Sequence, residues 1–150
     1  MGLTKEQLLI PRVMCVGGKE GEPNDTSGDF ITGDILTQTE KRFSKWKSSK
    51  LKHTVYLDTS FIEKFPHLFR PMPWWEGRKP EDMPEYVVFN NDSLAVYYKV
   101  TTWDKISENI WQFVLNDSRK FSYDMTVWGS TISPATEQEY NEYIKQKEAL

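Results

Sequence analysis

Side chains that could hold a ligand are concentrated in residues 65–80 of this chain. Trp74 and Trp75 are adjacent there, and Arg70 and Arg78 flank them. Aromatic rings stack on planar groups and attract cations, and guanidinium groups bind carboxylates and phosphates through paired hydrogen bonds. This combination predicts a site for a small anionic, nucleotide-like ligand or for an acidic partner surface. The competing interpretation is that the rings pack in a core.

Four prolines in the same segment restrict how it can present these rings. Proline fixes φ and lacks an N–H donor, so the segment is neither a long helix nor a central strand. Adjacent residues of an extended segment point to opposite sides. We therefore expect one tryptophan to anchor the segment in the core and the other to lie exposed as a binding spot.

A second cluster, residues 41–52, contains six cations and no acid. Phe43 and Trp46 lie among these cations, which is the pattern that phosphate contact combined with base stacking requires. The alternative function is therefore nucleic-acid binding through Lys41, Arg42, Lys45, Trp46, Lys47 and Lys50. The competing interpretation is a solvated hairpin whose rings lie under the core and whose lysines protect a strand edge.

Residue types that catalyse reactions are scarce in this chain. The two histidines, His53 and His67, lie in no recognisable nucleophile–base arrangement. Cys15 follows apolar residues in an expected strand, where a thiol is usually buried and unreactive. We therefore expect a protein that is not an enzyme.

Metal ligands are equally sparse. One cysteine and two distant histidines do not provide a zinc site of familiar spacing. Asp25, Asp29 and Asp34 do not have the spacing of a calcium-binding EF-hand loop, and solvation of a loop explains them better. We expect neither a metal nor another cofactor.

Composition sets broader limits. The 150 residues include 14% aromatics and a single cysteine, which excludes an internal disulfide and favours a reduced, cytoplasmic setting. No apolar run approaches the length that crosses a bilayer, and residues 1–6 lack the pattern of a signal peptide. The net charge of −3 argues against nucleic acid as an obligate partner of the whole surface.

The elements that must position these residues are mostly strands. Apolar alternation and turn residues predict strands at 12–16, 30–37, 53–57, 86–89, 94–100, 110–115 and 121–128. Capping boxes at Thr4/Gln7, Ser60/Glu63 and Thr136/Glu139 predict two short helices and a C-terminal helix. The predicted fold is α+β and mainly β: one domain, residues 1–150, forming an antiparallel, partly closed SH3-like barrel with short helices and a C-terminal helix.

Several segments also carry a resemblance. They are Gly33-Asp34-Ile35-Leu36, residues 65–69, residues 74–86 and residues 134–140. Together they resemble a short domain of phages and prophages of gut Bacteroidetes-type bacteria, over most of the chain. The shared motifs are structural rather than catalytic. The resemblance implies a phage-encoded protein, and we expect it to act in the host cytoplasm by binding a host protein, a virion partner or a small anionic ligand.

Overall fold

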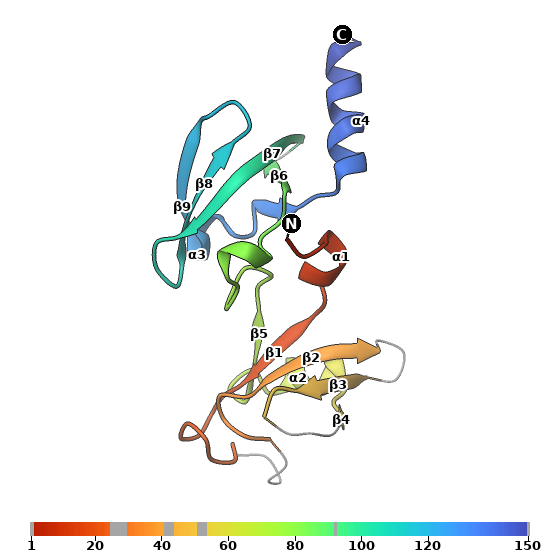
Figure 1. Ribbon diagram of the computed structural model, residues 1–150. Coiled ribbons are helices and arrows are strands. Elements are labelled where there is room, and N and C mark those ends of the chain that lie inside the picture. The colour runs from red at the N-terminus through yellow and green to blue at the C-terminus, as the bar shows by residue number, and fades with distance from the viewer. Residues whose placement is uncertain (1, 25–29, 41–43, 51–53, 92, 150) are drawn as a thin grey trace. The chain divides into compact units, whose positions relative to one another are not determined.

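The computed structural model describes residues 2–24, 30–40, 44–50, 54–91 and 93–149. Its internal contacts divide the chain into two compact units (Figure 1). The small unit is Ile10–Trp74, and the large unit combines Met1–Leu9 with Trp75–Leu150. Each unit contains one five-stranded antiparallel sheet. That residues 1–150 fold as a single domain stays a prediction.

The sheet of the small unit has the strand order β4-β3-β2-β1-β5. Its elements are β1 (Arg12–Cys15), β2 (Ile35–Glu40), β3 (Lys45–Ser48), β4 (Thr54–Tyr56), α2 (Thr59–Lys64) and β5 (Phe69–Met72). Proline cannot donate to a ladder, and Pro71 accordingly lies in β5, an outer strand of this sheet. Alternate residues such as Val13, Cys15 and Phe69 enter the core cluster.

The sheet of the large unit has the strand order β10-β6-β7-β8-β9. The elements of this unit are α1 (Lys5–Leu8), the 3₁₀-helix η1 (Pro80–Asp82), β6 (Tyr86–Asn91), β7 (Leu94–Lys105), β8 (Ile110–Leu115), β9 (Lys120–Asp124), α3 (Met125–Trp128), β10 (Ile132–Pro134) and α4 (Glu137–Glu148). The two predicted hairpins are present, since β6 pairs with β7 and β8 pairs with β9, both antiparallel.

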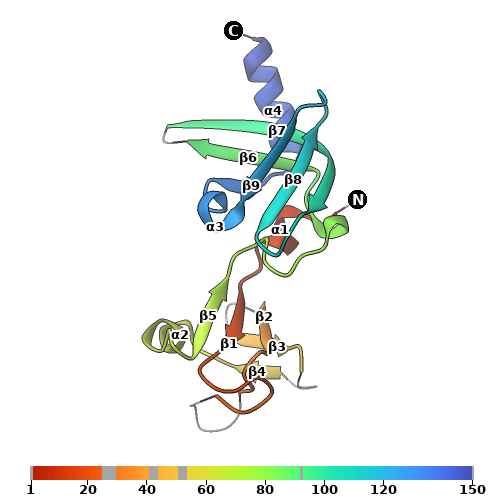
Figure 2. The same ribbon diagram turned by 90° about the vertical axis from the view of Figure 1, so that its left-hand side faces the viewer.

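The long strand β7 bends the second sheet. Its first half pairs with β6, and its second half, from Val100 to Lys105, pairs with β8. The register shifts between Val100 and Thr102, which is the geometry of a β-bulge, and a bulge bends a strand and increases its twist. Figure 2 shows β6 and the first half of β7 running across the direction of β8 and β9. The sheet therefore has a concave face, on which residues of β6 and β9 approach each other.

The structure confirms some of the elements that the sequence predicts and corrects others. The mainly-β prediction is confirmed, but neither sheet closes among the described strands, so the partly closed barrel is not confirmed. The capping boxes at Thr4 and Thr136 are present and begin α1 and α4. The Ser60 box is wrong, because α2 begins at Thr59 after Asp58 and makes no side-chain cap bond. The expected strand 121–128 ends at Asp124, whose side chain caps α3.

The helices of the described residues are short, and the longest of them, α4, has 12 residues. None of them is both long and apolar enough to cross a bilayer.

Candidate functional site

The most distinctive surface of the large unit is formed by aromatic rings on the concave face of its sheet. We call it the aromatic face, and its rings come from β6, β7, β8, β9 and the adjoining helix α3: Phe89, Tyr98, Phe113, Phe121, Tyr123 and Trp128. Phe113 pairs directly with Phe121 across β8 and β9, so their side chains share one face. Val87, the residue opposite Tyr98, lies two residues before Phe89, so the β6 and β7 rings share that face as well.

The bend of β7 brings these rings into one cluster. Phe89 lies 5.3 Å from Tyr98 and 5.7 Å from Tyr123, measured between ring centroids. Phe121 and Tyr123 are nearly parallel, with an interplanar angle of 13° and centroids 6.0 Å apart. Trp128 extends the cluster, 5.6 Å from Tyr123. Ring pairs at these separations attract one another beyond the simple burial of area.

Burial divides the aromatic face into a base and an accessible surface. Phe113 is 1% exposed, so it belongs to the core. Phe89, Tyr98, Phe121 and Tyr123 are half-buried, and Trp128 is 46% exposed. Burial, and then the charge of Tyr98, raises the pKa of Tyr123 above its ordinary value, so this hydroxyl remains a neutral donor. A planar molecule can contact the exposed parts of these rings.

Arg119 supplies a cation at one end of the aromatic face. Its guanidinium carbon lies 5.5 Å from the centroid of Tyr98 and 5.8 Å from that of Phe121. Asp117 holds it in place, since Nε of Arg119 donates to Oδ2 of Asp117 at 2.8 Å. The residue between them, Ser118, has a φ of 72°, and this turn places the carboxylate beside the guanidinium. The arginine side chain is 55% exposed, so its terminal nitrogens face a position that a ligand can reach.

The two tryptophans of the predicted site are both buried. Trp74 is 9% exposed and belongs to the small unit, and Trp75 is 5% exposed and belongs to the large unit. The expectation that one of them lies at the surface is therefore wrong. The extended segment on which that expectation depended is also absent at this point, because Trp74 and Trp75 lie in a turn. Trp75 is seated close to Gly129, where an added Cβ would lie 2.4 Å from Nε1 of the indole.

The two arginines of that predicted site also divide between the units. Arg70, exposed on β5, lies beside Met14, with 3.4 Å between a terminal nitrogen and Sδ. Arg78 is half-buried, and a terminal nitrogen lies 3.4 Å from the carbonyl oxygen of Leu8. Burial lowers the pKa of Arg78, and the charge of Asp82 opposes this effect. Trp74, Trp75, Arg70 and Arg78 therefore do not form a site within either unit, and their role as a joint site stays a prediction.

The basic segment lies only partly within the described residues. Lys41, Arg42 and Phe43 fall outside them. Trp46 is 2% exposed and its Nε1 donates to the carbonyl oxygen of Leu57 at 2.8 Å, so this ring is in the core and cannot stack on a base. Lys45 lies 3.7 Å from Glu40. Lys47 is exposed on the same face of β3 as Lys45, opposite to Trp46.

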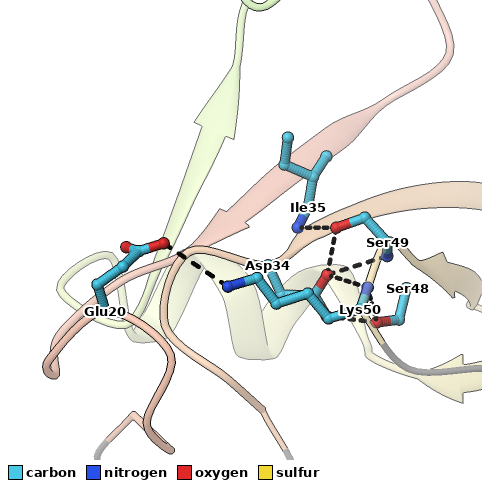
Figure 3. A network of polar contacts seen from close by, with 6 residues as sticks. All are labelled: Glu20, Asp34, Ile35, Ser48, Ser49 and Lys50. Carbon is cyan, nitrogen blue, oxygen red and sulfur yellow. Dashed lines mark hydrogen bonds and ion pairs between the residues drawn. The ribbon is translucent and has the colours of Figure 1, made fainter.

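Asp34 has a structural role that the sequence analysis missed. This side chain is fully buried rather than solvated, and its carboxylate accepts bonds from the hydroxyls of Ser48 and Ser49 and from the backbone nitrogen of Lys50 (Figure 3). Nζ of Lys50 in turn lies 3.6 Å from Glu20. Because a buried carboxylate is stable only when its oxygens are hydrogen-bonded, this network fixes the turn after β3. The signal in the sequence is the run Ser48-Ser49, whose donors suit one carboxylate.

The candidate catalytic residues that the structure describes lie in different surroundings. Cys15 is fully buried, and burial, followed by the nearby charge of Asp34, raises its pKa to about 12. His67 is exposed, with its ring 6.0 Å from that of Phe65, and His53 lies outside the described residues. Within the described ranges, no three His, Cys, Asp or Glu side chains are grouped as metal ligands would be.

Sequence reasoning missed the aromatic face itself. It identified apolar alternation in residues 110–115 and 121–128 but gave the rings of Phe113, Phe121 and Tyr123 no role. The available signal was the alternating aromatic residues at 111, 113, 121 and 123, with the cation Arg119 between the two pairs. Comparison with known proteins adds nothing to it, since no family model, no curated protein and no solved structure matches this chain. The resemblance to a phage domain thus stays a prediction.

Proposed function

We propose that this is a non-enzymatic binding protein that holds a small planar ligand with one anionic group, such as a nucleotide, on the aromatic face. One observation carries the proposal: the guanidinium of Arg119 lies over Tyr98 and Phe121 and is exposed at the end of a continuous set of half-buried rings. The rings would stack on the plane of the ligand, and the terminal nitrogens of Arg119 would bind its carboxylate or phosphate.

Charge supports a ligand with few negative groups at this face. The large unit carries a net charge of −5, from nine Lys or Arg against fourteen Asp or Glu. A strand of nucleic acid needs several cations along its backbone. The aromatic face has Arg119, and this arginine already shares its charge with Asp117. A single phosphate or carboxylate therefore suits the site better than a polyanion.

Nucleic-acid binding by the basic segment is the second candidate, and one observation favours it. The small unit carries a net charge of +2, from ten Lys or Arg against eight Asp or Glu, so the charge of the chain is unevenly divided. Lys45 and Lys47 would contribute phosphate contacts from one face of β3. Burial of Trp46 removes the stacking ring that this proposal included, so it ranks below the aromatic face.

The biological setting remains part of the proposal. A phage-encoded protein in the cytoplasm of a bacterial host would meet nucleotides in solution and would also meet host and virion proteins. A protein partner would use the same exposed rings and Arg119, with an acidic side chain in place of the ligand anion. The resemblance described above is the support for this origin.

The test is an NMR or fluorescence titration with nucleoside monophosphates, the matching uncharged nucleosides and simple aromatic carboxylates. We expect the charged ligands to bind more tightly than the nucleosides. Arg119→Ala should weaken the charged ligands about tenfold or more, as loss of a hydrogen bond to a charged group implies. Affinity for the nucleosides should change little.

The matched control is Lys120→Ala, which removes the neighbouring cation on the opposite face of β9. It should leave both affinities near those of the unaltered protein. If no planar anion binds at millimolar concentration, or if Lys120→Ala and Arg119→Ala have equal effects, the aromatic face is not the ligand site and the proposal fails.

A further inference from the structure

A hollow on the other face of the same sheet lies between helix α4 and strand β7. It measures about 290 Å³ and is lined by Ala95, Tyr97, Glu139, Glu142, Tyr143 and Gln146. The four helical residues are spaced at i, i+3, i+4 and i+7, so they occupy one side of α4. The small side chain of Ala95 leaves space opposite them. Helix and strand thus form a recess that belongs wholly to the large unit.

Two tyrosine pairs fix α4 above this recess. Tyr140 lies 5.2 Å from Tyr86, and Tyr143 lies 5.3 Å from Tyr97, measured between ring centroids. Thr136 and Glu139 form the capping box that begins the helix, so the first turn is well defined. The recess is therefore held open by packed rings and a capped helix. Tyr97 and Tyr143 are half-buried and form part of its wall.

The charges that line the recess are negative. Glu139 and Glu142 contribute carboxylates, and no Lys or Arg is among the lining residues. Burial by itself would raise the pKa of Glu139, but hydrogen bonds from Lys5 and Thr136 outweigh it and lower the pKa. Lys5 binds both carboxylate oxygens of Glu139 at 3.0 Å. Glu142 is exposed and is held at 3.4 Å by Gln138, a neutral donor, so its charge remains available to a ligand.

The protein already places a cation on one of these rings. Nζ of Lys147 lies 5.9 Å from the centroid of Tyr143. This distance is within the range at which an ammonium group is attracted to an aromatic face. Lys147 is exposed and follows Tyr143 by one helical turn, so it can leave the ring when a stronger ligand arrives. Tyr143 is therefore a ring with a cation-binding geometry, and it lies near the carboxylate of Glu142, to which the neutral amide of Gln138 donates a hydrogen bond.

We infer that the recess between α4 and β7 binds a cationic side chain, the ammonium of lysine or the guanidinium of arginine, presented by a basic segment of a protein partner. The cation would lie against Tyr97 and Tyr143 and pair with Glu142, and its aliphatic stem would pack on Ala95. The net charge of −5 on the large unit would attract such a segment. This inference does not depend on the aromatic face, which lies on the opposite side of the sheet.

The experiment is an NMR titration of the full chain with the blocked amino acids N-acetyl-lysine amide and N-acetyl-arginine amide, with N-acetyl-norleucine amide as the uncharged probe. We expect the two cationic probes to shift amide signals around Tyr97, Glu142 and Tyr143, with weak affinity that falls as salt is added. Norleucine should produce no such shifts. Equal shifts by all three probes would overturn the inference.

Three variants test the assignment of roles. Glu142→Gln should weaken the cationic probes about two- to fivefold, as expected for a partly exposed ion pair. Glu148→Gln, on the same helix but outside the recess, should have no effect. Lys147→Gln should strengthen binding, because it removes the internal competitor from Tyr143. If Glu142→Gln and Glu148→Gln behave alike, or if Lys147→Gln weakens binding, the recess is not a cation site.

Discussion

The ring of Phe89 on β6 lies 5.7 Å from the ring of Tyr123 on β9, although β7 and β8 separate these strands in the sheet. Strands three places apart in a flat sheet are separated by about 14 Å, since neighbours are spaced about 4.8 Å. The contact is therefore a direct consequence of the bulge in β7 between Val100 and Thr102. It converts the inner side of an open sheet into a concave surface with rings on both flanks.

This arrangement predicts unequal effects of removing two neighbouring rings. Phe113→Ala should reduce the free energy of unfolding by about 3–5 kcal/mol, because the side chain is 1% exposed and leaves a cavity. Phe121→Ala, from the half-buried ring opposite it, should cost clearly less and instead weaken ligand binding. Urea denaturation of both variants measures the difference. Equal destabilisation would mean that Phe121 is a core residue and not part of a binding surface.

The elements of this fold were more predictable from sequence than their arrangement. The capping boxes at Thr4 and Thr136 and the hairpins of β6–β9 depend on local chemistry, and the structure confirms them. The bulge at Thr101 and the separation into two units depend on long-range packing, which no local pattern specifies. The predicted strand over 121–128 fails for a local reason that the prediction overlooked, since Asp124 caps α3 and so ends β9.

In the candidate site, too, the residue types could be recognised from the sequence, whereas their burial and contacts could not. Tryptophan content drew attention to residues 65–80, but ring type alone does not distinguish a core ring from an exposed one. Trp74, Trp75 and Trp46 are all buried, whereas Trp128, which no sequence pattern emphasised, is 46% exposed. Asp34 was interpreted as a solvated loop residue. Its four hydrogen-bond donors come from residues 48–50, which lie at the other end of the β2–β3 hairpin, so no local pattern reveals them.

Cys15 predicts a dependence of stability on alkaline pH. Its pKa is raised from 9.0 to about 12 in the folded state by burial and then by Asp34. The unfolded thiol therefore ionises first, so the contribution of this group to stability is complete below pH 9 and declines as pH rises from 9 toward 12. The slope in that window should approach about 1.4 kcal/mol per pH unit.

The comparison variant is Cys15→Ala, which has no thiol to titrate while the tyrosines and lysines are unchanged. The difference in unfolding free energy between the parent protein and this variant, measured by urea denaturation at pH 8, 9, 10 and 10.5, should shrink across the upper part of this range. A constant difference would show that the folded and unfolded thiols share one pKa. Native Cys15 should also react slowly with a thiol reagent at pH 8.

The burial of both tryptophans changes the expected outcome of their removal. Trp74→Ala and Trp75→Ala should each lower the free energy of unfolding by roughly 3–5 kcal/mol, where an exposed ring would have cost little. Thermal or urea denaturation followed by circular dichroism measures both losses. A nearly unchanged denaturation curve for either variant would restore the expectation of a surface tryptophan in this segment.

The close approach of Gly129 to Trp75 provides a more specific test. An added Cβ at Gly129 would lie 2.4 Å from Nε1 of Trp75 and 2.4 Å from the carbonyl oxygen of Met125, both too close for atoms that do not move. Gly129→Ala should therefore destabilise the protein and shift the indole fluorescence, whereas Ser130→Ala, one residue later and exposed, should change neither. In the Trp75→Ala background the cost of Gly129→Ala should fall, because one of the two clashing groups is gone. A double-mutant cycle with additive costs would place the indole away from Gly129.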